Sequence, residues 1–237
     1  MRRTLQPLLL DRTPRYREAA YAAIKDAILS RQFDPSEALV EEKIAAALTI
    51  SRTPVREALA ILEHEQLIAP RNGRGLYVRE LAREEFVALF VANEAVEPTM
   101  ARRAALRAAP EQLDAMREAI GRAEHSVVNR DSVAFLRASR DFHRLVGEAS
   151  GNVPLTAFVL SNEERADMYL LSANKVVDTA SMDASNREHA AILAAISQRD
   201  PEAAARLAIY HAQSLRERFA DLFRPNKEDV VLGTAAD

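Results

Sequence analysis

Three of the five histidines lie in stretches whose apolar residues recur at helical spacing. His143 shares its predicted face with Leu136 and Val146, and His189 and His211 lie in two later stretches of the same kind. If these helices pack into one bundle, the three imidazoles can bind a divalent metal ion, zinc first of all, and leave positions open for a ligand. The same histidines can instead contact a ligand directly, without a metal.

An open metal position also suits hydrolysis, so a three-histidine metal hydrolase is a second class of protein to weigh. On the predicted histidine face, Ser139 is the one hydroxyl or carboxylate that is placed to act as a base or nucleophile. The pattern therefore favours binding over catalysis, and we expect a protein that is not an enzyme.

A second group of charged residues opens the stretch SRTPVREALAILEHEQL, residues 51–67. Arg52 and Arg56 lie in its first helical turn, where the helix dipole favours anions. Thr53 before Pro54 predicts the start of the helix, because Thr is a good N-cap and Pro suits the first helical position. The two arginines are either ordinary solvated charges or contacts to a polyanion.

The segments around this stretch predict a winged helix-turn-helix. Apolar residues recur at helical spacing in 16–33 and 40–48, the third helix starts near Ser51, and two short apolar runs flank the hairpin turn Asn72-Gly73. The second helix of such a motif enters the major groove of DNA. We therefore expect Arg52, Thr53 and Arg56 to contact double-stranded DNA.

The predicted hairpin would then be the wing of this motif. Arg71, Arg74 and Gly75 lie on it, and we expect them to contact the DNA backbone or the minor groove. The alternative is a solvated helix end beside a surface hairpin, without any DNA contact.

The rest of the chain predicts six helices, at 83–106, 110–128, 130–150, 153–172, 185–198 and 200–223. Gly151 is typical of a helix end, and Asp200-Pro201 is typical of a helix start. The fold class is therefore mainly α: an N-terminal winged helix-turn-helix at 15–80 and an antiparallel all-α bundle at 83–223. A flexible arm (1–14) and a polar tail (224–237) are expected to flank them.

Composition narrows the class of protein further. The absence of cysteine excludes disulfides and thiolate metal sites, and no apolar run approaches the roughly 20 residues that span a bilayer. We expect a cytoplasmic protein without membrane contact. The net charge of −3 divides into +2 over residues 1–80 and −5 over 81–237, which suits a DNA-reading first part and a different task for the second.

Two regions resemble one known family. The stretch ISRTPVREALAILEHEQLI…RGLYV resembles the winged-helix motif of the GntR family of bacterial transcription regulators, with Gln66 in place of the usual glycine. The segments FHRLVGEASGN (142–152), EHAAILAAISQRDPEAA (188–204) and YHAQSL (210–215) are similar to the FCD ligand domain of the FadR branch. The resemblance implies a homodimer on operator DNA, a small-molecule effector in each bundle, often an organic acid, and most often repression.

The resemblance also implies the metal site at the three histidines. In metal-binding members an aspartate four residues before the first histidine completes the site, and here that position is Ser139. Asp141 lies about 200° around the helix from His143, so its side chain is expected to point away. The missing carboxylate weakens the site, and a metal-free pocket remains the alternative.

A second departure from the family concerns the effector. Many FCD domains carry an inward arginine four residues before a glutamate; Glu97 is present here, but Asn93 stands at the arginine position. We expect the effector site to comprise Asn93, Glu97 and Ser139 together with the three histidines, although Asn93 can equally be a structural hydrogen-bonding residue. A DNA-binding protein whose bundle only dimerises is the remaining alternative.

Overall fold

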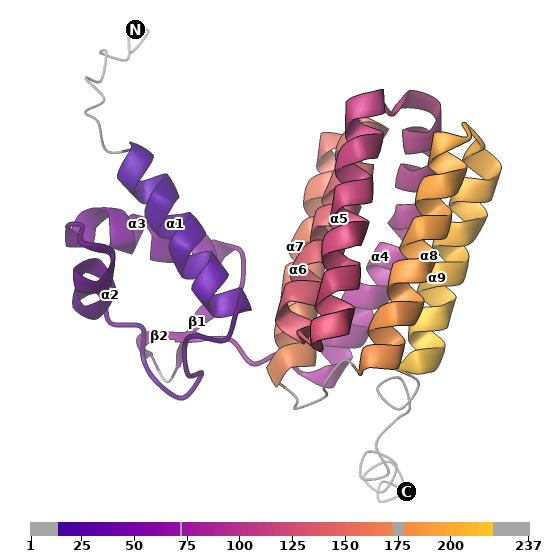
Figure 1. Cartoon of the computed structure of the whole chain (residues 1–237). Coiled ribbons are helices and arrows are strands. Elements are labelled where there is room, and N and C mark those ends of the chain that lie inside the picture. The colour runs from indigo at the N-terminus through magenta and orange to yellow at the C-terminus, as the bar shows by residue number, and fades with distance from the viewer. Residues whose placement is uncertain (1–13, 72, 173–177, 220–237) are drawn as a thin grey trace, which may run out of the picture. The chain divides into compact units, whose positions relative to one another are not determined.

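The computed structural model describes residues 14–71, 73–172 and 178–219, which fall into two compact units divided between Glu80 and Leu81 (Figure 1). The expected arm (1–14), except for Pro14, and the expected tail (224–237) lie outside the described residues, as does Asn72 of the expected turn. Among the described helices, none is both long enough and apolar enough to cross a membrane.

The first unit contains three helices followed by a two-stranded antiparallel hairpin, as the sequence predicted. The elements are α1 (Pro14–Leu29), α2 (Glu41–Leu48), α3 (Arg52–His64), β1 (Ile68–Arg71) and β2 (Arg74–Val78). In the hairpin Ile68 pairs with Val78 and Ala69 with Tyr77. The hairpin follows α3 directly, which is the element order of a winged helix-turn-helix.

Helix α3 is fixed by the apolar stripe that it presents to the core. Val55, Leu59 and Leu62 are fully or almost fully buried, at a spacing of four and three residues that keeps them on one face. The helix begins at Arg52 with Ser51 as N-cap, so the prediction of Thr53 as the N-cap was wrong. The Ser51 side chain makes no capping hydrogen bond, and Pro54 fits inside the first turn because its missing N–H has no intrahelical acceptor there.

Gln66 connects α3 to the hairpin with a backbone φ of 62°. This left-handed conformation favours glycine, the residue usual at this position of the motif that the sequence resembles. The chain therefore turns here with a residue that is strained in this conformation.

The second unit is a bundle of helices that lie side by side in Figure 1. Its described helices are α4 (Arg83–Arg107), α5 (Pro110–Asn129), α6 (Ser132–Ser150), α7 (Val153–Ser172), α8 (Thr179–Ser197) and α9 (Pro201–Arg218). All six were predicted, but α8 begins six residues earlier than expected, because the Asp178 side chain caps it by accepting from the Ser181 N–H. Gly151 ends α6 and Asp200 caps α9, as predicted.

The core of the bundle contains many small residues, so its helices approach closely. Met100, Met116, Phe142 and Ile196 are almost fully buried among alanines of α4, α5 and α9. At Gly147 of α6 an added Cβ would lie 2.6 Å from Cγ2 of Thr156, which shows how tightly α6 packs against α7. Glycine at position 147 therefore allows α6 and α7 to approach closely.

Candidate functional site

The bundle brings His143 of α6, His189 of α8 and His211 of α9 together in its interior. The Nε2 atom of His189 lies 3.2 Å from Nε2 of His143 and 3.2 Å from Nε2 of His211. His189 and His211 are almost completely buried, and one ring nitrogen from each of the three falls within 4.8 Å of the others.

This spacing fits a metal ion bound by three nitrogens. Nitrogen ligands about 2.0–2.1 Å from a zinc ion lie about 3.4 Å apart along a tetrahedral edge, close to the 3.2 Å found here. Burial, together with the nearby His211, lowers the pKa of His143 to about 3, and burial holds the pKa of His189 well below its usual value. Both rings are therefore neutral, as metal ligation requires.

Carboxylates behind two of the rings hold them in the orientation that a metal needs. Nδ1 of His211 lies 2.7 Å from Oε2 of Glu188, whose two oxygens also accept from Arg218 at 2.7 and 2.9 Å. Burial raises the pKa of Glu188, but the hydrogen bonds from Arg218 and His211 outweigh it and lower the value to about 2. Nδ1 of His143 lies 3.4 Å from Oε1 of Glu163. Each carboxylate favours the tautomer whose Nε2 is free to bind a metal.

Ser139 occupies the position at which metal-binding members of the family carry an aspartate. Ser139 lies one turn before His143 and lines a cavity beside that histidine. Asp141 points elsewhere, as predicted, because its carboxylate pairs with Arg122 at 2.7 Å and Arg144 at 2.9 Å. Asp141 therefore does not compensate for the absence of an acid at position 139.

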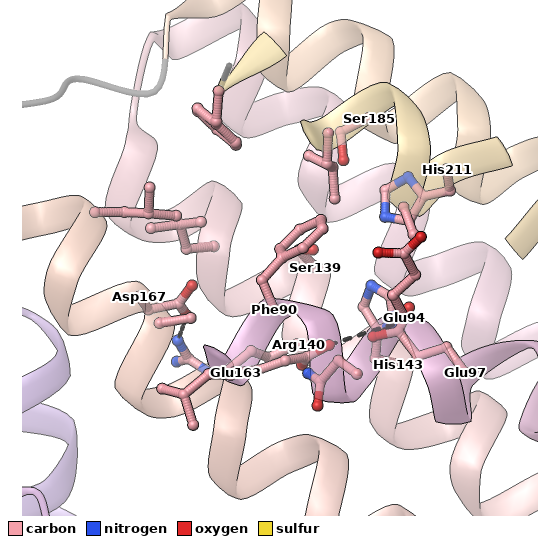
Figure 2. A pocket seen from close by; sticks show the side chains of 18 of the residues that line it. Phe90, Glu94, Glu97, Ser139, Arg140, His143, Glu163, Asp167, Ser185 and His211 are labelled. Carbon is pink, nitrogen blue, oxygen red and sulfur yellow. Dashed lines mark hydrogen bonds and ion pairs between the residues drawn. The ribbon is translucent and has the colours of Figure 1, made fainter. Parts of the chain in front are cut away.

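A cavity of about 110 Å³ lies beside two of the histidines, His143 and His211 (Figure 2). Aromatic and aliphatic side chains form most of its wall: Phe86, Leu89, Phe90, Phe135, Leu136, Leu170, Leu215 and Phe219. A mostly apolar cavity with a few convergent polar groups is typical of a small-molecule site. The arrangement can therefore enclose a small ligand next to the histidines.

Asn93 and Glu97 of α4 both line this cavity. Oδ1 of Asn93 accepts from Nδ2 of Asn162 at 2.9 Å, and its own Nδ2 donates to the carbonyl of Val159 at 3.4 Å. These bonds link α4 to α7, so the structural role of Asn93 is favoured over ligand contact. Oε1 of Glu97 lies 3.9 Å from Nδ1 of His143, and burial raises the Glu97 pKa.

Four charged residues of the cavity were missed by the sequence analysis: Glu94, Arg140, Glu163 and Asp167. Arg140 and Asp167 form a buried ion pair, on the side of the cavity away from His211 in Figure 2. Burial, opposed by Arg140, raises the Asp167 pKa to about 6. Glu163 and Asp167 are four residues apart, so they share a face of α7, but Glu164 and Arg165 between them make the sequence resemble an exposed face.

In the first unit, Arg52 and Arg56 lie on one face at the start of α3 and are largely exposed. Arg56 donates to both oxygens of Glu41 at 2.9 and 2.8 Å, and Arg52 donates to Glu42 at 2.7 Å. Thr53 is exposed at the same helix end. The predicted DNA-contacting side chains are thus gathered at one end of α3 and paired with acids of α2.

The predicted wing residues lie on the hairpin. Arg71 of β1 extends over the ring of Tyr77, with its guanidinium carbon 4.8 Å from the ring centre, and lies 3.6 Å from Glu80. Arg74 opens β2 opposite Arg71. Gly75 has a φ of 66°, which explains the glycine.

Comparison with known proteins decides the family. Residues 16–78 match the family model of bacterial regulatory proteins of the gntR family, and residues 88–214 match that of the FCD domain. The chain belongs to the GntR family and carries an FCD domain. This GntR/FCD protein is therefore a transcriptional regulator and not an enzyme, as the sequence predicted, and its predicted fold class is confirmed.

Individual relatives agree with this assignment. The GntR/FCD chain is 27% identical over 227 residues to the Uxu operon transcriptional regulator of Escherichia coli, which spans 88% of each chain. It is 28% identical over 219 residues to the transcriptional repressor NanR of Escherichia coli, covering 81% of this chain and 80% of NanR.

Solved structures share the fold. McbR/YncC of Escherichia coli has a TM-score of 0.75 at 18% identity, covering 88% of this chain and 97% of that one. A GntR regulator from Rhodococcus has a TM-score of 0.73 at 23% identity, covering 89% and 99%.

Proposed function

We propose that this GntR/FCD regulator is a repressor whose affinity for operator DNA is controlled by a metabolite bound beside His143, His189 and His211. We further propose that these three histidines hold a divalent metal ion, zinc first of all. The observation that carries the proposal is that Nε2 of His189 lies 3.2 Å from Nε2 of both His143 and His211, with carboxylates behind two of the rings.

The residues present define what such a centre would do. Three neutral imidazoles leave the charge of a zinc ion uncompensated, and Ser139 adds none, so the centre would attract an acid oxygen of the effector. The same lack of a carboxylate makes the ion itself less tightly held than in relatives with an aspartate. Glu188 and Glu163 support the proposal because they favour the metal-binding tautomers of His211 and His143.

A metal-free pocket is the second candidate. A protonated Nε2 of His189 can also donate a hydrogen bond to Nε2 of His143 or of His211, both 3.2 Å away, and the absence of the aspartate at Ser139 favours this reading. In this case the ring nitrogens themselves would bind the effector, and the metal content separates the two candidates.

On the DNA side, α3 enters the major groove and the hairpin contacts the flanking backbone. Arg52 and Arg56 would exchange Glu41 and Glu42 for base edges or phosphates. We infer that the protein acts in the cytoplasm, where operator DNA lies, as a homodimer whose two α3 helices read the two halves of the operator. The name of the relative NanR supports repression.

The effector acts by preferring one of two arrangements of the protein. A ligand can shift an equilibrium only by its difference in affinity for the two states. An effector in the cavity contacts α4, α6 and α9 together, so its binding changes how these helices pack. We propose that this change alters the placement of the winged helices and weakens operator binding.

The first test is the metal content and DNA preference of tag-free protein. Elemental analysis after zinc loading and dialysis should give about one zinc per chain, and anisotropy titrations should show tighter binding to the protein's own promoter region than to random duplex. No zinc in the dialysed protein would leave the metal-free candidate. Equal affinity for both duplexes would refute operator recognition.

A further inference from the structure

The cavity beside the histidines holds more acidic than basic side chains. Among the described residues that line it, the carboxylates are Glu94, Glu97, Glu163 and Asp167, and the one arginine is Arg140. Arg140 is already paired with Asp167 in the protein interior, and Glu94 lies 3.1 Å from Arg216. Of the four carboxylates, only Glu97 and Glu163 are not assigned to an arginine of the bundle by these contacts.

These two carboxylates lie close together, although they come from different helices. Oε1 of Glu97, from α4, and Oε1 of Glu163, from α7, lie 3.9 and 3.4 Å from the same atom, Nδ1 of His143. A neutral imidazole has one N–H, so it can satisfy one carboxylate oxygen at most. The pair has more acceptor capacity than its surroundings use.

One oxygen shows this surplus directly. Oε2 of Glu163 is buried and has no hydrogen-bond partner. Buried polar atoms are nearly always paired, because an unpaired one forfeits its hydration without any compensation. An orphaned carboxylate oxygen in the wall of a ligand cavity indicates that a donor belongs there.

We propose that Glu163 and Glu97 bind an ammonium group of the effector, so that the ligand is a short amino acid rather than a simple organic acid. An ammonium supplies three N–H donors and a positive charge, which suit two nearby carboxylates. Burial raises the pKa of Glu97, and burial together with Glu97 raises the pKa of Glu163 well above its usual value, so a cation between the two would stabilise their charged forms inside apolar walls. The binding of the ligand's acid group depends on the proposed metal centre. The binding of its ammonium group depends only on Glu163 and Glu97.

The length of the ligand follows from His143. Its Nε2 faces the other histidines and its Nδ1 faces the two carboxylates, so the acid-binding and amine-binding positions lie on either side of one imidazole ring. A cavity of about 110 Å³ also favours a small ligand over a large one. A short linear ω-amino acid spans this arrangement.

The test compares amino acids with hydroxy acids of the same length. Zinc-loaded full-length protein is titrated calorimetrically with 3-aminopropanoate, 4-aminobutanoate and 5-aminopentanoate, and with the corresponding ω-hydroxy acids. At least one amino member should bind about tenfold or more tightly than its hydroxy partner, because only the ammonium forms charge-assisted bonds to the carboxylates.

Variants assign this preference to the carboxylate pair. Glu163→Gln should abolish the preference, while Glu164→Gln, the same change at the next residue and outside the cavity wall, should leave it intact. Glutamine keeps an oxygen that can accept from Nδ1 of His143, so Glu163→Gln should still take up zinc when zinc is saturating. Equal binding of both series, binding by neither, or an unchanged preference in Glu163→Gln would overturn the proposal.

The same samples separate this inference from the proposed function. A preference for amines that depends on Glu163 in a protein without zinc would remove the metal centre but keep the ammonium site. Zinc bound at one per chain, with hydroxy acids preferred, would keep the metal centre but remove the ammonium site. A second zinc per chain that is lost in Glu163→Gln would show that Glu97, His143 and Glu163 bind a metal ion, and would overturn the ammonium assignment.

Discussion

The winged helix-turn-helix and the helical bundle use charged and polar side chains in opposite ways. In the first unit, Arg52 and Arg56 have 54% and 64% of their side chains exposed and pair with acids of α2. In the bundle, His189 and His211 are 1% and 2% exposed, and Glu188 is held from the opposite side by Arg218.

This difference in exposure determines whether each unit can exchange its polar contacts for those of a partner. An exposed ion pair contributes about 0–1 kcal/mol, so Arg56 can leave Glu41 for DNA at little cost. Buried polar groups cannot change partners so cheaply, because each must keep its hydrogen bonds. The DNA-binding surface is therefore ready to exchange contacts, whereas the histidine site is fixed before a ligand arrives.

The largest expected effect is the loss of metal binding in His189→Ala. Removing the central one of three ligands should weaken zinc binding by at least about 100-fold, more than the 10–100-fold that loss of a supporting residue typically causes. Competition with a chromophoric chelator measures this change. His125→Ala, on the exposed face of α5, is the matched control and should keep wild-type affinity. Equal zinc affinity in both variants would contradict the histidine centre.

Gly147→Ala tests whether the bundle is as rigid as the site requires. The added Cβ would lie 2.6 Å from Cγ2 of Thr156, a β-branched side chain on α7, so the variant should lose about 2 kcal/mol of unfolding free energy. Gly121→Ala is the control, since its Cβ would meet nothing within 4 Å and helix propensity should add about 0.5–1 kcal/mol. Urea unfolding followed by circular dichroism measures both. Similar stability changes would show a bundle that adapts freely.

Arg56→Ala tests the exposed DNA-binding surface at the start of α3. The variant should lose about tenfold or more in affinity for the specific operator, because a bidentate arginine contact to guanine contributes about 1–3 kcal/mol of discrimination. Anisotropy titration against operator and random duplex measures the loss.

Arg187→Ala serves as the control for that variant. Arg187 lies on α8 with 71% of its side chain exposed and pairs with Asp183, so its removal changes the net charge equally. Operator affinity should be unchanged. If both variants weaken binding to both duplexes by the same factor, α3 does not read sequence.

Gln66→Gly should give the smallest effect, an increase of about 0.5–1 kcal/mol in the stability of the first unit. Gln66 has a φ of 62°, where glycine avoids the clash of Cβ with the backbone. Gln198→Gly is the control: its φ is −81°, so glycine only adds freedom to the unfolded chain and should destabilise. Thermal unfolding followed by circular dichroism compares them, and destabilisation by both would argue against strain at Gln66.

Much of the fold could be predicted because it depends on local patterns. The apolar spacing of α3, the αL glycine at Gly151 and the Asp200-Pro201 start are signals within a few residues of each other. The start of α8 was missed because its first turns lack a regular apolar stripe, and the Asp178 cap alone does not distinguish a helix from a turn. Thr53 was predicted as the N-cap because it directly precedes Pro54, whereas the helix begins one residue earlier, at Arg52.

The site was less predictable because it depends on which helices face each other. The three histidines lie in apolar stripes, so their inward orientation could be predicted, and the family resemblance indicated that they meet. Glu163 and Arg140 lie among other charged residues, a pattern that usually marks an exposed face. Their burial follows from the packing of α4, α6 and α7 around the cavity, which the sequence of one helix alone does not show.

The most direct test of the central claim measures operator affinity with and without small metabolites, in the wild type and in His189→Ala. Fluorescence anisotropy with the protein's own promoter region, at about 150 mM salt, is repeated after adding the low-molecular-weight fraction of a cell extract. We predict that the wild type releases the operator in response, and that His189→Ala binds the operator but does not respond. Equal responses from the two proteins, or no preference for this promoter over random duplex, would contradict the account.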